Sequence, residues 1–210
     1  MNTSLRTSFA VAAALGVSAL SLQAAPRAFD FKDPKGVNNV QFKLDAPLES
    51  ITGTATGISG TVSFDAAKPE ATTGRIVLDA ATLTVGNSMM GEHLRSNQWL
   101  DVAQFPSIVF EAVALKNVRN QGGQILADVT GRLTVKGITK DVTAPVTLTY
   151  LADKLGARVG DAKVKGDLLV LRTNFQINRS DFGIKAGEMT DKVAESISLS
   201  LSIAGASPRS

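Results

Sequence analysis

The sequence contains no cysteine among its 210 residues. Disulfide bonds and thiolate metal sites are therefore excluded, and the folded state must be stabilised by burial and by hydrogen bonds within secondary structure. A chain of this length can bury enough apolar surface for that purpose. The sequence also has a single histidine, His93, and a lone imidazole needs carboxylate partners that the sequence does not identify. We expect no metal site and no cofactor.

A strong charge imbalance is also missing. The formal net charge is +3, and removal of a leader that contains Arg6 leaves +3 − 1 = +2. The lysines and arginines are scattered among aspartates and glutamates, so they form no basic stripe. Nucleic-acid binding depends on such a stripe. We therefore predict no nucleic-acid partner.

Long apolar runs are absent as well. No stretch reaches the roughly 20 residues that a transmembrane helix needs, so no transmembrane segment is predicted. The longest run, Phe9–Leu22, covers about 14 residues, follows Arg6 and ends just before Ala24. This pattern is typical of a secretory signal peptide, here residues 1–24. It predicts an exported protein with one domain, residues 25–210.

Helical periodicity is scarce, whereas alternation of apolar and polar residues is common. In Ser196–Ile203, serine alternates with isoleucine or leucine. Similar stretches meet at short turns, Asn120–Gly123 and Lys136–Thr139, which favours an antiparallel meander. About eight strands with one apolar face each lose their free edges by closing into a barrel, which has room for side chains or one small ligand. An immunoglobulin-like sandwich is the alternative, but its usual cysteine pair and tryptophan spacing are absent.

Three other stretches complete this all-β prediction. Arg75–Val85 is predicted to form one long strand, since apolar residues recur along it. Phe29–Gly36 is polar and is expected to be irregular. Leu151–Gly166 is charged and interrupted by glycine, so it is expected to be an exposed connection.

One segment, Met89–Phe110, breaks the strand-like pattern. Apolar residues near its start fall close to helical spacing, and Pro106 separates them from an alternating stretch. The spacing predicts a short helical insert near residues 87–100. The segment contains His93 and the only tryptophan, Trp99. Such an insert suggests a plug or clamp at the mouth of a barrel, and simple closure of the core is the alternative.

Catalytic motifs are not evident. No Gly-x-Ser-x-Gly nucleophile elbow and no phosphate-binding glycine loop of the Walker type occur. A second local signal is Ile177–Ile184, in which Arg179 and Asp181 follow a predicted strand. The segment fits a strand-end turn in which Asp181 caps backbone donors. It also fits a pocket rim at which the Arg179 guanidinium binds a phosphate or carboxylate head group.

Three motifs in this order resemble those of the YceI-like family. They are Gly91–Ala112, Gly131–Lys140 and Arg179–Gly183, and the resemblance extends over about Val37 to Ile203. It implies an extended, lipocalin-like antiparallel barrel, exported to the periplasm, that holds a long isoprenoid or related amphiphilic chain in an apolar cavity.

The chain departs from the family pattern at two sites. Val37-Asn38 stands where the family often has His-Ser, and Gly91-Glu92 stands where it often has Arg-Asp. These changes would remove polar groups from a head-group site. His93 and Arg179 match the family pattern and are the polar candidates for ligand contact.

We therefore expect a non-enzymatic carrier or sequestering protein for an isoprenoid-type lipid, such as a polyprenyl chain or a quinone. The alternatives are an exported hydrolase that uses His93, and a barrel with a filled core that acts through a partner protein. The sequence leaves a homodimer open. The candidate ligand-binding residues are Phe42, Met89, Met90, His93, Leu94, Trp99, Phe110, Leu133, Leu148, Phe175, Arg179 and Phe182.

Overall fold

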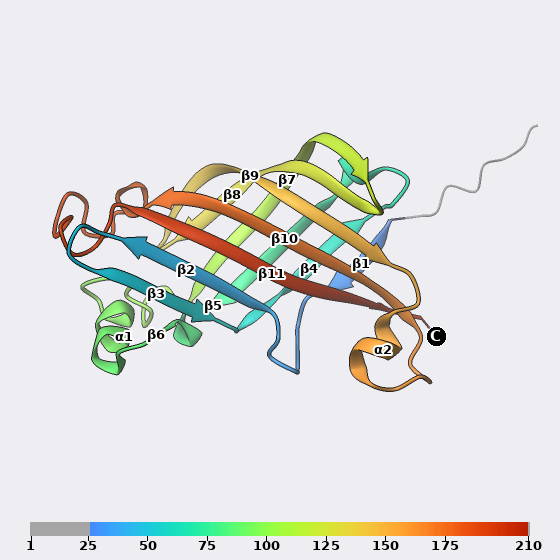
Figure 1. Cartoon of the computed structure of the whole chain (residues 1–210), viewed down its shortest axis with the longest axis horizontal. Helices are drawn as coiled ribbons and strands as arrows, with labels where there is room; N and C mark the ends of the chain where they lie inside the picture. Colours follow the sequence, from blue (N-terminus) through green and yellow to red (C-terminus); the bar gives the residue numbers. More distant parts are fainter. Residues whose placement is uncertain (1–25, 210) are drawn as a thin grey trace, which may run out of the picture.

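A computed structural model describes residues 26–209, and these form one elongated antiparallel sheet that closes on itself (Figure 1). The predicted signal peptide at residues 1–24 lies outside the described residues. The strands are β1 (Arg27–Asp30), β2 (Asn39–Asp45), β3 (Ser50–Ala55), β4 (Ile58–Phe64), β5 (Thr73–Asp79), β6 (Thr84–Val85), β7 (Ser107–Gln121), β8 (Gln124–Val135), β9 (Ile138–Leu151), β10 (Gly166–Asn178) and β11 (Ser196–Pro208). The α-helices in this part of the chain are α1 (Ser88–Arg95) and α2 (Leu155–Val159), and the 3-10 helices are η1 (Pro69–Ala71), η2 (Ala80–Thr82) and η3 (Arg179–Phe182).

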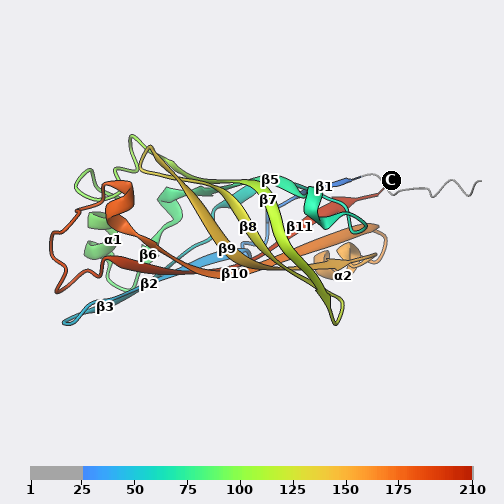
Figure 2. The ribbon, with the colours of Figure 1, turned by 90° about the horizontal axis from the view of Figure 1, so that it is seen from above.

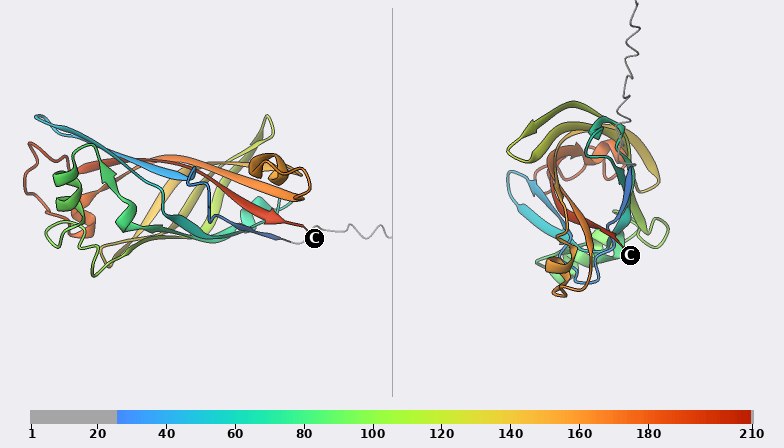
Figure 3. Two further views of the ribbon diagram at one scale, coloured as in Figure 1. Left: turned by 90° about the horizontal axis from the view of Figure 1, so that it is seen from below. Right: turned by 90° about the vertical axis from the view of Figure 1, so that its right-hand side faces the viewer.

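Eight strands form the closed ring, in the order β1-β4-β5-β7-β8-β9-β10-β11 and back to β1. The last pairing joins Asp30 to Ala206. Seen end-on, the strands surround a central axis (Figure 3). Because the sheet closes on itself, the sandwich alternative is wrong and the predicted eight-stranded antiparallel barrel is confirmed. The helical insert expected near residues 87–100 is also present, as α1.

The barrel is extended at one end by a second group of strands. β2 pairs with β11 over Ser198–Ser202, farther along the edge of β11 that also carries β1. β3 pairs with β2, and β6 with β3, so the wall continues beyond the ring (Figure 2). β1 and β2 therefore act as two halves of one long strand along β11.

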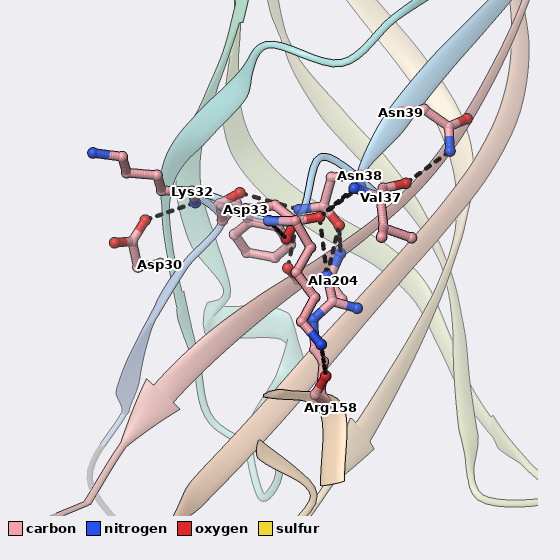
Figure 4. A network of polar contacts seen from close by, with 10 residues as sticks. Asp30, Lys32, Asp33, Val37, Asn38, Asn39, Arg158 and Ala204 are labelled. Atoms are coloured by element: carbon pink, nitrogen blue, oxygen red, sulfur yellow. Dashed lines mark hydrogen bonds and ion pairs between the residues drawn. The ribbon is translucent and has the colours of Figure 1, made fainter. Parts of the chain in front are cut away.

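The side chain of Asn38 bridges the break between β1 and β2 (Figure 4). It is 2% exposed, accepts a hydrogen bond from the Ala204 N–H at 2.8 Å and donates to the Ala204 carbonyl at 3.1 Å. It also donates to the Phe31 carbonyl at 3.1 Å. The amide thus replaces the missing peptide unit, and buried backbone groups that the break would otherwise leave unpaired are satisfied.

Replacing Asn38 with leucine is expected to destabilise the protein by about 3 kcal/mol, because both polar groups of Ala204 and the Phe31 carbonyl would stay buried without a partner. Urea unfolding monitored by circular dichroism measures this change. Asn39→Leu is the matched control, since the Asn39 amide is hydrogen-bonded at an exposed position. Equal effects of the two substitutions would contradict the role assigned to Asn38.

Three local predictions were wrong. Arg75–Val85 is not one strand, because the Asp79 side chain accepts a hydrogen bond from the Ala81 N–H at 2.9 Å and starts the 3-10 turn η2. Phe29–Gly36 is not wholly irregular, since it includes the end of β1 and two fully buried rings, at Phe29 and Phe31. The expected exposed connection contains α2, which buries Leu155.

Aromatic packing fills the end of the barrel near β1. The rings of Phe29, Phe64 and Tyr150 lie with centroids 6.1 to 6.3 Å apart, two of the three pairs edge to face. Phe31 and Leu169 beside them are fully buried. Edge-to-face aromatic pairs are stabilising beyond the area that they bury. This end of the barrel is therefore solid, and we call it the closed end.

A buried carboxylate, Asp167, ties the closed end together. It is 1% exposed and accepts hydrogen bonds from the Tyr150 hydroxyl at 2.8 Å and the Asp153 N–H at 2.9 Å. Arg27 and Arg209 form ion pairs with it. Burial alone would raise the pKa of Asp167, but these hydrogen bonds and the two guanidinium charges outweigh it and lower the pKa below its usual value of 3.8.

The lowered pKa of Asp167 predicts acid-sensitive stability. The carboxylate stabilises the fold above its unfolded pKa, and this contribution is lost as the pH falls below about 4 toward the folded pKa. Asp167→Asn should be less stable at pH 7, and its stability should fall less steeply than that of the wild type between pH 5 and 3. Urea unfolding of both proteins across this pH range measures the free energy of unfolding at each pH. If the two proteins lose stability in parallel as the pH falls, Asp167 is not the source of the acid sensitivity. The stability of Asp167→Asn should still fall somewhat with decreasing pH, because the pKa values of Asp33 and Glu195 are also lowered.

Candidate functional site

The interior of the barrel holds a cavity of about 740 Å³. Inward-facing side chains from the strands of the ring other than β1, and from β2, β3 and β6, form its wall. Phe110, Leu171 and Phe175 point inward but are only half-buried, because they face this space instead of packing against other side chains. Ligand pockets commonly measure about 300–1,000 Å³. The barrel is therefore hollow over much of its length, and its core is solid only at the closed end.

The mouth of the cavity lies at the end opposite the closed end. Eight of the lining residues are exposed, and they come from only three places: the β2–β3 turn, the segment from residue 87 through α1 to residue 98, and the segment 183–194. Figure 1 shows these segments together at the end of the barrel away from α2. The eight are Glu49, Asn87, Met89, Met90, His93, Gln98, Met189 and Lys192.

The deep wall presents apolar surface. Two threonines there, Thr72 and Thr173, donate their hydroxyl groups to the backbone carbonyls of Pro69 and Pro145, each at 2.6 Å. The other polar side chains of the wall, apart from Arg179, lie at the mouth. A ligand in this cavity would thus meet hydrocarbon along its length and polar groups at one end.

All twelve sequence-predicted site residues line the cavity. Phe42, Phe110, Leu133, Leu148 and Phe175 lie on strands, as expected for walls. Met89, Met90, His93 and Leu94 lie on α1, Trp99 follows it, and Arg179 and Phe182 belong to η3. Their contact with a ligand stays a prediction.

Two glycines, Gly53 on β3 and Gly131 on β8, each make room for an aromatic ring from the adjacent strand. A Cβ atom at Gly53 would lie 2.1 Å from the Phe42 ring, and one at Gly131 would lie 2.5 Å from the Phe110 ring. Each ring therefore lies flat across a backbone that has no side chain. This arrangement keeps both rings against the wall and leaves the centre of the barrel open.

Arg179 is placed differently from the sequence-based interpretation. Its side chain is 1% exposed, and each of its five N–H groups donates to a backbone carbonyl. The carbonyl oxygens belong to Ala194 (3.2 Å), Ile184 (3.0 Å), Val193 (3.2 Å), Lys185 and Glu188. Glu195 adds an ion pair at 3.6 Å. Because no donor is left over, the geometry argues against Arg179 as the anion partner of a head group and makes it the organiser of segment 183–194.

Sequence reasoning missed the part of the mouth that this segment forms. Lys185, Met189 and Lys192 line the cavity, as does Glu49 in the β2–β3 turn. No periodicity marks them, because the segment is a succession of turns held by Arg179. The departure at Val37-Asn38 lies outside the cavity lining, so it does not alter a head-group site there.

His93 has no ion-pair partner in the part of the chain that the structure describes. Its side chain is exposed on α1, and no ion pair within residues 26–209 joins it to a carboxylate. A histidine that activates a nucleophile is normally oriented by such a partner. In the same residues, no group of three or more histidine, aspartate or glutamate side chains is arranged to hold a metal ion.

Comparison with protein families identifies the barrel. The model of the YceI-like domain matches residues 33–204, which is most of the chain. The chain belongs to the YceI-like family. Among relatives of this YceI-like chain, a UPF0312 protein of Pseudomonas savastanoi pv. phaseolicola is 33% identical over 188 residues, covering 88% of this chain and 91% of its own. A UPF0312 protein of Pseudomonas putida strain GB-1 is 31% identical over 205 residues, covering 96% and 97%.

Solved structures share the YceI-like fold. BcnA of Burkholderia cenocepacia superposes with a TM-score of 0.65 at 23% identity and covers 80% of this chain and 95% of its own. The YceI protein of Campylobacter jejuni gives 0.61 at 19% identity, covering 75% and 84%. A polyisoprenoid-binding domain from Saccharophagus degradans, implicated in plant cell wall breakdown, gives 0.63 at 12% identity, covering 87% and 99%. At these identities the similarity establishes the fold.

No helix in residues 26–209 of the YceI-like chain is both long enough and apolar enough to span a membrane.

Proposed function

We propose that this YceI-like protein is an exported, periplasmic and non-enzymatic binding protein for an isoprenoid-type or other amphiphilic lipid, such as a polyprenyl chain or a quinone. The observation that carries the proposal is the hollow barrel, in which a deep apolar cavity ends in a mouth with polar side chains. The polyisoprenoid-binding domain of Saccharophagus degradans, named for the same ligand class, supports it.

The apolar wall would supply most of the affinity. Each CH₂ group that moves from water into an apolar cavity gains about 0.8 kcal/mol, so a long tail contributes more than a head group can. Ordering of the chain and loss of its overall motion offset much of this gain. The tail would therefore set the strength of binding, and the mouth residues, which include Glu49, His93, Gln98 and Lys192, would select the head group.

The proposal is tested with the mature protein. Organic extracts of protein purified from its own host should contain a copurified isoprenoid lipid, identified by mass spectrometry. Titration with a polyprenyl alcohol should change the fluorescence of Trp99, the only tryptophan, which lines the cavity. Absence of both the lipid and the fluorescence change would refute the proposal.

The hydrolase alternative remains testable with one substitution. An enzyme that uses His93 would lose activity by about 10²-fold or more in His93→Ala, as is typical when general acid–base catalysis is removed. A screen with ester and phosphoester substrates should show no activity that depends on this residue. Lipid binding by His93→Ala should persist, because the tail contacts are unchanged.

A further inference from the structure

Exposed apolar side chains gather around the mouth of the cavity. In residues 26–209, eight large apolar side chains are exposed, and five of them belong to segments at the mouth: Leu48, Met89, Met90, Ile138 and Met189. We call these five residues the apolar collar. The other three, Val37, Val113 and Val159, lie on segments elsewhere. Scattered exposed apolar residues are ordinary, whereas a concentration at one place marks an interaction surface.

Four separate segments contribute to the collar. Met89 and Met90 lie on α1, and Met189 lies in segment 183–194; all three also line the cavity. Leu48 lies in the β2–β3 turn, where its N–H donates to the Asp191 carbonyl at 2.9 Å. Ile138, at the β8–β9 turn, lies against Gly183. Figures 1 and 2 place all four segments at the same end of the barrel, so the collar surrounds the mouth.

Ligand binding inside the barrel does not account for the whole collar. Leu48 is 68% exposed and Ile138 is 38% exposed, and neither lines the cavity. A leucine at the tip of a turn gains nothing from a tail that lies inside the barrel. The exposure of these two side chains therefore indicates that the collar contacts an apolar surface outside the protein.

Charge gives the collar no preference for an anionic surface. The positive charges of the collar segments, Arg95, Lys136, Lys185 and Lys192, are matched by the negative charges of Glu49, Glu92, Glu188 and Asp191. Binding to anionic lipids relies on clusters of lysine and arginine, which are absent from this end within residues 26–209. Insertion of apolar side chains at the headgroup boundary does not need such clusters.

We propose that the apolar collar docks the mouth of the barrel onto a phospholipid bilayer. This inference rests on the proposed function, because a ligand with an insoluble tail resides in a bilayer and must enter and leave through the mouth. The collar is continuous with the cavity wall through Met89, Met90 and Met189. A docked mouth lets the tail pass from bilayer to cavity along apolar surface, without exposure to water.

Flotation with vesicles of phosphatidylcholine and phosphatidylethanolamine tests the docking. The wild-type mature protein should float with these neutral vesicles, and raising the salt from about 0.1 to about 0.5 M should leave the bound fraction unchanged, since screening affects only charge-driven binding. The double substitution Leu48→Ser with Ile138→Ser should lower the vesicle partition coefficient by about 10-fold or more. The matched control, Val37→Ser with Val113→Ser, removes two exposed apolar side chains away from the mouth and should behave as the wild type.

Two further measurements separate docking from ligand binding. Trp99 fluorescence with a short prenyl alcohol, without vesicles, should respond equally in all three proteins, because neither pair of residues lines the cavity. Circular dichroism should show the same unfolding midpoint for both double variants. Transfer of a fluorescent polyprenyl lipid out of vesicles should be slowed about 10-fold in the collar variant alone.

The outcomes are distinguishable. Normal ligand binding by a wild-type protein that does not float would overturn the docking and leave the proposed function standing. Flotation without any ligand response would support the docking and count against the proposed function. Flotation that requires anionic lipid and disappears at high salt would overturn the collar as its cause. Self-association of the wild type that the collar variant loses, measured by analytical ultracentrifugation, would assign the collar to a contact between two copies of the chain.

Discussion

Replacing Ala112 with tryptophan is expected to weaken polyprenyl binding by about 100-fold or more. Ala112 lies on β7, lines the cavity and is only half-buried, so the added indole has space to enter. It would occupy the volume that the tail needs and displace several CH₂ groups, each worth about 0.8 kcal/mol. The fold should persist, because the side chain fills empty space instead of overpacking a dense core. Titration with a polyprenyl alcohol in competition with a fluorescent lipid measures the loss of affinity. The amount of lipid that copurifies with the variant gives a second measurement.

The same strand offers a matched control. Val113 is the next residue, is 61% exposed and points away from the cavity. Val113→Trp adds a similar indole on the outside of the barrel and should bind lipid as the wild type does. Equal loss of binding in both variants would indicate a general effect on folding, and full binding by Ala112→Trp would show that the ligand does not occupy the barrel.

Replacing Arg179 with methionine is expected to destabilise the protein by about 4 kcal/mol. The substitution keeps a long apolar stem but removes five donors, so five carbonyl groups of segments 183–188 and 193–194 lose their partner in a largely buried environment. Each buried acceptor left without a donor costs about 1–3 kcal/mol, and the partial burial of three of the five hydrogen bonds lowers the total. Urea unfolding measures this loss, and lipid binding should decline with it, because the segment forms part of the mouth.

Two variants delimit the role of Arg179. Arg179→Lys keeps the charge but offers three donors at one point, so it should recover less than about half of the lost stability. Arg172→Met removes an exposed guanidinium on the preceding strand, β10, and should change stability by less than about 0.5 kcal/mol. If Arg179→Lys is as stable as the wild type, charge and not the five-donor geometry is what the site requires.

The strands of the ring could largely be predicted, because alternation of apolar and polar residues is a local property. Ser196–Ile203 lies entirely within β11, and the β8–β9 turn, Lys136-Gly137, falls within the predicted turn Lys136–Thr139, whose last two residues begin β9. The break between β1 and β2 could not be predicted in the same way. It depends on a side chain, Asn38, that completes the ladder against Ala204, a residue far along the sequence.

The hollow interior is the second feature that alternation does not determine. An inward-facing Phe110 or Phe175 gives the same pattern whether it packs against another side chain or borders a cavity. The difference lies in Gly53 and Gly131, which let the rings of Phe42 and Phe110 lie flat against the wall. Glycine in a strand suggests a close approach of some group, but the approaching group becomes known only from the fold.

The candidate site was predictable where it lies on regular elements. The wall positions follow from strand alternation, and Met89, Met90, Leu94 and Trp99 follow from the exceptional helical insert. The role of Arg179 was not predictable, since its five acceptors are backbone carbonyls, which every sequence possesses. Segment 183–194 was missed for the same reason: its shape is determined by that one side chain.

The packed rings of Phe29, Phe64 and Tyr150 close one end of the barrel. If the barrel binds a polyprenyl chain as proposed, a linear tail would enter end first through the mouth and leave by the same path. Each added isoprene unit would strengthen the complex until the cavity is filled, and further units would remain outside. The protein would then discriminate among homologues by length, without any group that recognises their chemistry.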